Sequence, residues 1–286
     1  MTSKNPKDNI GNITQNISSG GIPMAQIQVN FFSRSLSRQV TINAIIPADR
    51  FIFPPNAEKP AKPFKTMYLL HGIFGNYTDW ASCTRIQEWA SEKNLAVIMP
   101  SADNSFYVDN PDKGDMYGEF IGKELVEITR DLFHLSHKRE DTFIAGLSMG
   151  GFGAIRNGLK YSETFGYIAG LSAALVLDHA VVSNNDTPTL IGRRSYFQSV
   201  FGDLDKLLAS DINPEVLLTS LKQSGKPIPK MYICCGTEDN LIETNQKLHK
   251  FLQDNGIEHI YIEDTGAHDW DYWNLHIKKV LDWLPL

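Results

Sequence analysis

The feature that most constrains this chain is the segment 146–150, which reads Gly-Leu-Ser-Met-Gly. An apolar run with strand character, residues 142–147, leads into it, and a small-residue segment with helix character, residues 152–159, follows it. A strand that turns this sharply into a helix strains the backbone, and a Cβ two residues to either side of Ser148 would collide with the adjoining strand or helix. We predict that Ser148 projects from the turn as a nucleophile; the alternative is a glycine-rich turn with an incidental serine.

The composition is that of a globular protein that can bury a sizeable core, with 42% hydrophobic and 21% charged residues over 286 positions. A net charge of −6 argues against nucleic-acid binding, which needs a basic face. No apolar run in the sequence is long enough to span a membrane. The three cysteines argue against a disulfide framework, and no metal-ligand spacing is present, so we expect neither a metal nor another cofactor.

The first 23 residues differ in character from the rest of the chain. They are polar, and we expect residues 1–23 to form a disordered or dispensable tail ahead of a single domain at 24–286. The tail lacks the apolar core of a signal peptide, which favours a cytoplasmic location. The sequence leaves open whether translation starts at Met1 or Met24, and whether the protein forms a homo-oligomer.

Hydrophobic periodicity predicts the order of the elements. Alternating residues predict a hairpin with its turn at 33–38, and continuous apolar runs predict buried parallel strands. An amphipathic helix is expected at 117–133, and an irregular excursion over the active site at about 173–224. The other expected strands are 67–70, 95–99, 142–147, 167–171, 231–235 and 257–262, and the other expected helices are 84–93, 243–254 and 273–284. This alternation predicts an α/β fold: a mostly parallel sheet with an antiparallel N-terminal hairpin and helices on both faces.

A serine nucleophile needs a base and an orienting carboxylate at the carboxyl ends of the strands. Of the histidines that follow Ser148, His268 alone lies in a loop just after a late strand, so we expect it to be the base; the alternative is a surface histidine. The acid should end the strand at 231–235. Both Glu238 and Asp239 follow that strand, and we favour Asp239.

The tetrahedral intermediate needs backbone donors for its oxyanion. We expect one from the N–H of Met149, directly after the nucleophile, and one from Ile73 in the loop after the strand at 67–70. Aromatic residues near these loops are candidates for an acyl or phenolic pocket, with core packing as the alternative for each. The candidate pocket residues are Phe74, Trp80, Tyr107 and Trp270.

The assembled motifs resemble the putative-esterase branch of the α/β-hydrolases, and most closely its tributyrin-esterase group. The branch also includes esterase D-type S-formylglutathione hydrolases and feruloyl and acetyl-xylan esterases. The shared segments run in the order of that branch and span nearly everything from Met24 onward: 69–80, 99–109, 145–154, 235–239 and 268–273. The oxyanion loop departs from the esterase D pattern, because Gly-Ile-Phe-Gly stands where those enzymes carry Gly-Leu-Thr-Cys.

The resemblance implies a serine carboxylesterase that acts on a small-molecule ester and uses no cofactor. It implies Ser148, Asp239 and His268 as the triad, and strengthens Asp239 over Glu238. The expected substrates are short-chain acyl, acetyl or phenolic (feruloyl-type) esters. The alternatives are an S-formylglutathione-type thioesterase, an acyltransferase, and a non-catalytic binding protein on a hydrolase scaffold.

Overall fold

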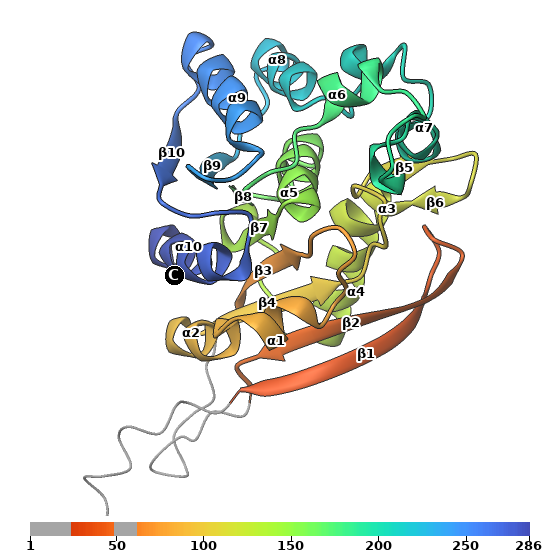
Figure 1. Ribbon diagram of the computed structural model, residues 1–286. Coiled ribbons are helices and arrows are strands. Elements are labelled where there is room, and N and C mark those ends of the chain that lie inside the picture. Colours follow the sequence, from red (N-terminus) through yellow and green to blue (C-terminus); the bar gives the residue numbers. More distant parts are fainter. Residues whose placement is uncertain (1–23, 49–61) are drawn as a thin grey trace, which may run out of the picture.

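The computed structural model describes residues 24–48 and 62–286; the predicted tail, residues 1–23, lies outside the described residues. An eight-stranded sheet in the order β1-β2-β4-β3-β7-β8-β9-β10 runs through the molecule (Figure 1). Its strands are β1 (Ala25–Ser33), β2 (Arg38–Ile46), β3 (Lys65–Leu70), β4 (Leu95–Pro100), β7 (Thr142–Leu147), β8 (Tyr167–Leu171), β9 (Lys230–Gly236) and β10 (His259–Asp264). A separate two-stranded ribbon joins β5 (Asp109–Asn110) to β6 (Asp115–Met116).

The pairing of the strands confirms the predicted α/β class. β1 pairs with β2, and β2 with β4, in antiparallel fashion, whereas all neighbours in the rest of the sheet, β4-β3-β7-β8-β9-β10, pair in parallel. The predicted hairpin turn is confirmed, because the register closes with Ser33 opposite Arg38. Parallel strands align their carboxyl ends, so the loops after β3, β7, β9 and β10 meet at one edge of the sheet.

Helices cover both faces of the sheet, as predicted (Figure 1). The helices are α1 (Asp79–Cys83), α2 (Ile86–Lys93), α3 (Tyr117–Glu119), α4 (Leu125–Leu132), α5 (Met149–Lys160), α6 (Leu177–Val182), α7 (Arg194–Phe201), α8 (Pro214–Ser224), α9 (Ile242–Asp254) and α10 (Trp270–Trp283). Alternate residues of β7 divide between the faces: Ile144 joins the core under α4, α5, α7, α8 and α9, while Phe143 and Ala145 join the core under α1, α2 and α10. Among the described helices, none is long and apolar enough to cross a membrane.

The predicted helix at 117–133 forms with an interruption. A π-helical turn at Phe120–Glu124 joins α3 to α4, and Glu124 is buried there. Its carboxylate accepts hydrogen bonds from Ser33 Oγ at 2.7 Å and from the backbone N–H of Arg34 at 2.6 Å and Ser35 at 3.0 Å. Glu124 therefore fixes the hairpin turn, a long-range role that its helical periodicity does not reveal.

Other boundaries differ from the predicted ones for local reasons. The helix predicted at 84–93 forms as α2, which begins at Ile86, and a separate short helix, α1, precedes it from Asp79. α10 begins at Trp270 rather than Trp273, because the Asp269 side chain accepts a hydrogen bond from Tyr272 N–H at 3.0 Å and caps the helix. The segment predicted as irregular, 173–224, contains three α-helices: α6, α7 and α8.

Candidate active site

The turn between β7 and α5 has the strained geometry that the sequence predicts. Ser148 adopts φ +53° and ψ −119°, a conformation that non-glycine residues rarely adopt. A Cβ on Gly146 would lie 2.3 Å from the Gly150 carbonyl oxygen, and a Cβ on Gly150 would lie 2.5 Å from the carbonyl oxygens of Leu70 and His71. These contacts confirm that the two positions exclude any side chain, which allows the serine to stand at the end of β7.

Three side chains meet at the carboxyl edge of the sheet. Ser148 comes from the end of β7, Asp239 from the turn after β9, and His268 from the loop between β10 and α10. Ser148 Oγ lies 3.0 Å from His268 Nε2, and His268 Nδ1 lies 2.8 Å from Asp239 Oδ2. A carboxylate can only accept, so the Asp239 contact assigns the proton to Nδ1 and leaves Nε2 free to accept the serine proton.

The environment of Asp239 keeps it ionised. Its side chain is fully buried, and burial by itself raises the carboxyl pKa. Hydrogen bonds from His268 and from the backbone N–H of Leu241 outweigh burial, so the pKa of Asp239 lies below its ordinary value. A charged carboxylate beneath an imidazole can orient the ring and stabilise the imidazolium that forms when the ring takes a proton.

Glu238, the alternative acid, contacts the backbone of Gly266 and has another role. Its carboxylate accepts a hydrogen bond from Gly266 N–H at 2.5 Å, and its own N–H donates to the Gly266 carbonyl at 3.0 Å. Glu238 therefore ties the turn after β9 to the loop that carries His268, and the structure brings only Asp239 of the two against the imidazole.

His71 has both ring nitrogens engaged in supporting the loop after β3. Nε2 accepts the Ala102 N–H at 2.9 Å, which places the proton on Nδ1, where it donates to the Gly72 carbonyl at 2.6 Å. Burial lowers the pKa of His71, so the ring is neutral. This network holds the segment that leads to Ile73.

Two backbone N–H groups near Ser148 remain open. Within the part of the chain that the structure describes, neither Ile73 N–H nor Met149 N–H has a hydrogen-bond acceptor. Phe74, the residue after Ile73, adopts φ +67° and donates its N–H to Asn104 Oδ1 at 2.8 Å. Asn104, which the sequence analysis did not single out, thus helps to shape this loop; it lies in the shared segment 99–109.

The four predicted pocket residues fall into two groups. Phe74 is exposed on the loop after β3, and Trp270 is half-buried at the start of α10. Trp80 and Tyr107 are buried core residues, which corrects their prediction as pocket residues. Each directs its polar atom to a backbone carbonyl: Trp80 Nε1–H donates to Leu70 at 2.9 Å, and Tyr107 Oη–H donates to His71 at 2.9 Å. Their rings pack beneath the loop after β3, so they belong to the core and are not available to contact a substrate.

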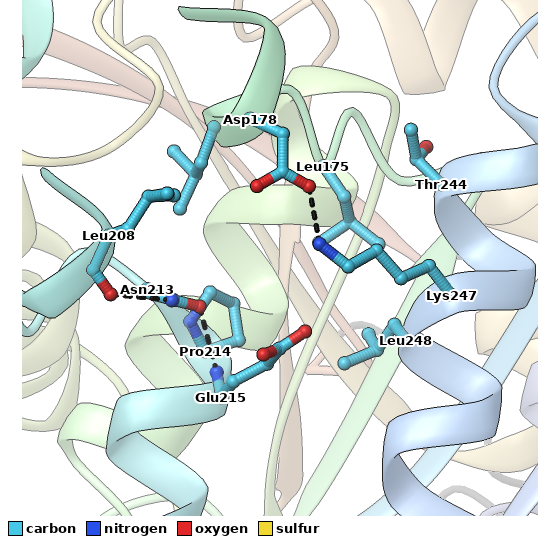
Figure 2. Close-up of a pocket in the computed structure, with 10 residues that line it drawn as sticks. Leu175, Asp178, Leu208, Asn213, Pro214, Glu215, Thr244, Lys247 and Leu248 are labelled. Atoms are coloured by element: carbon cyan, nitrogen blue, oxygen red, sulfur yellow. Dashed lines mark hydrogen bonds and ion pairs between the residues drawn. The ribbon is translucent and has the colours of Figure 1, made fainter. Parts of the chain in front are cut away.

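The segment 173–224 lies next to the nucleophile and also forms a separate cavity. Ala174 N–H donates to the Ser148 carbonyl at 2.9 Å, and Leu175 then lines a cavity of about 290 Å³ between α6, α8 and α9. Figure 2 shows this cavity, where an ion pair between Asp178 and Lys247 links α6 to α9. Ser148 does not line it. Among the described residues, no group of three or more His, Cys, Asp or Glu is placed to hold a metal ion.

Comparison with known proteins identifies the family of this chain. The family model described as Putative esterase matches residues 33–284. An acetyl esterase of Caldicellulosiruptor saccharolyticus is 44% identical over 261 residues, which are 91% of this chain and 98% of that protein. Fluorophosphonate-binding serine hydrolase F (FphF) of Staphylococcus aureus, solved with bound substrate, superposes with a TM-score of 0.81 at 31% identity and covers 92% of this chain and 98% of its own.

The S-formylglutathione hydrolase FrmB of Staphylococcus aureus superposes with a TM-score of 0.78 at 30% identity, over 92% of this chain and 99% of its own. The family match, the acetyl esterase and the serine hydrolase structures all indicate an esterase that uses a serine, and a strained serine stands at the edge of the mostly parallel sheet. The chain belongs to the Putative esterase family of the α/β-hydrolase fold and is a serine carboxylesterase.

Proposed function

We propose that this enzyme hydrolyses small esters of short acyl chains, acetyl esters foremost, with Ser148, His268 and Asp239 as its catalytic triad. The observation that carries the proposal is the continuous hydrogen-bonded path from Ser148 Oγ through His268 to Asp239, set at a strained turn. The name of the 44% identical relative, acetyl esterase, supports acetyl as the acyl group.

The reaction follows from this geometry. As Ser148 Oγ attacks the carbonyl carbon of the ester, its proton passes to His268 Nε2, and Asp239 stabilises the imidazolium. The carbonyl oxygen becomes an oxyanion, which accepts hydrogen bonds from the open N–H groups of Ile73 and Met149. The bond to the alcohol then breaks, and His268 gives its proton to the leaving alkoxide oxygen.

The second half of the reaction repeats these steps with water. Water gives a proton to His268 and attacks the acyl carbon, and the same two N–H groups bind the new oxyanion. The bond to Ser148 Oγ then breaks, the serine takes its proton back from His268, and the carboxylic acid leaves. Every proton taken by His268 is returned, so the cycle needs no other group.

The test is hydrolysis of a p-nitrophenyl ester series from acetate to decanoate, with methyl ferulate and S-formylglutathione beside it, on the wild type and on Ser148→Ala. We expect the highest kcat/KM with acetate, and a loss on the order of 10⁶ in kcat in the variant. A fluorophosphonate probe should label the wild type and not Ser148→Ala. Ser224→Ala, at the end of α8, is the matched control and should behave as the wild type. Activity retained in Ser148→Ala would refute the triad.

A thioesterase that acts on S-formylglutathione is the second candidate, because the FrmB structure is 30% identical and covers nearly the whole chain. The same mechanism serves a thioester, with a thiolate as the leaving group. A kcat/KM for S-formylglutathione well above that for p-nitrophenyl acetate would favour this candidate. Preference for methyl ferulate would instead favour phenolic esters.

The state of the cysteines bears on where the enzyme works. Cys83, Cys234 and Cys235 are all free thiols, and Cys234 and Cys235 are buried in β9. Free thiols are typical of a reducing compartment, which supports a cytoplasmic location. Fractionation of the native cells, with activity on p-nitrophenyl acetate as the marker, tests this part of the proposal.

A further inference from the structure

The loop after β4, residues 101–108, is held in a strained shape against the loop that carries Ile73. Asn104 lies in the middle of the strained stretch. Large aromatic residues rarely adopt a positive φ, and such strain gathers at functional sites, where the surrounding structure offsets it. The residues at positive φ in this loop are Asp103 at +45°, Phe106 at +52° and Tyr107 at +58°.

Ile73 and Phe74 are the two central residues of a tight turn. Gly75 N–H donates to the Gly72 carbonyl at 3.2 Å, which closes the turn, and Phe74 adopts φ +67° at its third position. A positive φ at that position is the geometry of a type II turn, which favours glycine there. The Phe74 side chain is 72% exposed, so packing does little to keep the backbone in this conformation.

A hydrogen bond holds the Phe74 backbone instead. Its N–H donates to Asn104 Oδ1 at 2.8 Å. Asn104 is fixed in turn from α7, because the Tyr196 hydroxyl donates to the Asn104 carbonyl at 2.9 Å. Type I and type II turns differ in the orientation of the peptide between the two central residues, so an acceptor for the Phe74 N–H selects one of the two turns.

We propose that Asn104 is a positioning residue for the oxyanion hole, and that it keeps the turn at 72–75 in the conformation that presents the Ile73 N–H to the oxyanion. The inference rests on the proposed function, in which Ile73 and Met149 bind that oxyanion. Without the Asn104 oxygen, Phe74 can return to negative φ, the peptide between Ile73 and Phe74 turns over, and the Ile73 N–H loses its direction. Asn104 needs no contact with substrate for this role.

The variant Asn104→Ala tests the proposal, with p-nitrophenyl acetate as substrate. We expect kcat to fall about 30-fold with KM within about threefold of the wild type. This loss is smaller than the roughly 10²–10³ that removal of an oxyanion-hole donor costs, because the Ile73 N–H is misdirected and not removed. An oxyanion forms in both halves of the reaction, so both should slow.

A transition-state analogue measures the oxyanion hole directly. When Ser148 Oγ bonds to the carbonyl carbon of trifluoroacetone, its proton passes to His268 and the ketone oxygen becomes an oxyanion. The inhibition constant of trifluoroacetone should therefore rise in Asn104→Ala by about the same factor as kcat falls. Tyr196→Phe keeps the aromatic ring and so folds even where Asn104→Ala does not. It should lower kcat and weaken inhibition about threefold, because one hydrogen bond to Asn104 is lost.

Two controls separate this role from others. Asn213→Ala also removes an amide oxygen that accepts a backbone N–H, that of Glu215 at 3.0 Å, but at the start of α8. It should lower the thermal midpoint and leave kcat and the inhibition constant unchanged. Ser148→Ala tests the triad itself: if it stays active, the proposed function fails.

If Ser148→Ala is inactive and Asn104→Ala keeps the kcat and inhibition constant of the wild type, the positioning role is overturned and the triad stands. A lower thermal midpoint of Asn104→Ala with an unmoved inhibition constant also overturns it, since a purely structural asparagine gives that result. Where Asn104→Ala does not fold, an unmoved inhibition constant in Tyr196→Phe overturns it in the same way.

Discussion

Replacement of Gly150 by alanine should separate catalysis from stability, because of what the new Cβ meets. It would lie 2.5 Å from the backbone carbonyl oxygens of Leu70 and His71, and an ordinary contact begins at 3.4 Å, so α5 and the end of β3 must move apart by about 0.9 Å. The loop with Ile73 begins at that point. A misplacement of about 1 Å in a catalytic constellation costs on the order of 10²-fold, so kcat/KM for p-nitrophenyl acetate should fall about 100-fold.

The cost in stability should be modest by comparison. Overpacking typically costs about 1–3 kcal/mol, and the change from glycine to alanine in a helix returns up to about 1 kcal/mol. The matched control is Gly158→Ala in the same helix, where the Cβ meets the Ile168 side chain at 2.4 Å, far from the nucleophile. We expect both variants to lose similar stability in urea denaturation, and only Gly150→Ala to lose activity. A Gly150→Ala enzyme with kcat/KM within threefold of the wild type would refute the reasoning.

Two further predictions concern the hairpin and the pocket. Burial raises the pKa of Glu124, but hydrogen bonds from Ser33, Arg34 and Ser35 outweigh it, so its folded pKa lies below the ordinary value of 4.5. Its contribution to stability is therefore present above that value and is lost as the pH falls through the folded pKa. Glu124→Gln should cost about 2 kcal/mol at pH 7 and progressively less as the pH falls through the folded pKa, as urea denaturation at pH 7 and through the acid range can check; a loss that does not change with pH would contradict the role of its charge. Phe74→Ala should change KM across the ester series without loss of stability, because the side chain is 72% exposed, whereas Trp80→Phe should lower the thermal midpoint and leave the order of substrates unchanged. The reverse pattern would place Trp80 in the pocket.

Much of the fold could be predicted because its signals are local. The strands at 142–147 and 167–171 are continuous apolar runs between turns, and they form at the predicted residues. The π-helical turn at 120–124 could not be predicted, because the burial of Glu124 depends on a hairpin turn some 90 positions away. The burial of Trp80 and Tyr107 could not be predicted either. An aromatic residue near a catalytic loop gives the same sequence pattern whether it faces the substrate or the core, and only the backbone carbonyl that its polar atom contacts distinguishes the two cases.

The candidate site could be assembled from one rule, that polar residues directly after parallel strands share an edge of the sheet. Applied to the strands that end before Asp239 and His268, it brought together side chains that the structure places 2.8 Å apart. Asn104 could not be found by this rule, because its effect on Phe74 passes through a backbone N–H that leaves no pattern in the sequence.

The alignment of Asp239 with His268 depends on backbone contact between the two loops that carry them. A Cβ on Gly236 would lie 2.1 Å from the Gly266 carbonyl oxygen, so the end of β9 and the loop after β10 approach as closely as main chains can. Glu238 fastens the same loop through the Gly266 N–H, and Thr237 N–H donates to the Asp264 carbonyl at 3.0 Å. If side chains alone joined the two loops, the distance between Asp239 and His268 would depend on rotamers, which change readily. Because the main chains set it here, the 2.8 Å contact between acid and base is built into the sheet and is present before any substrate binds.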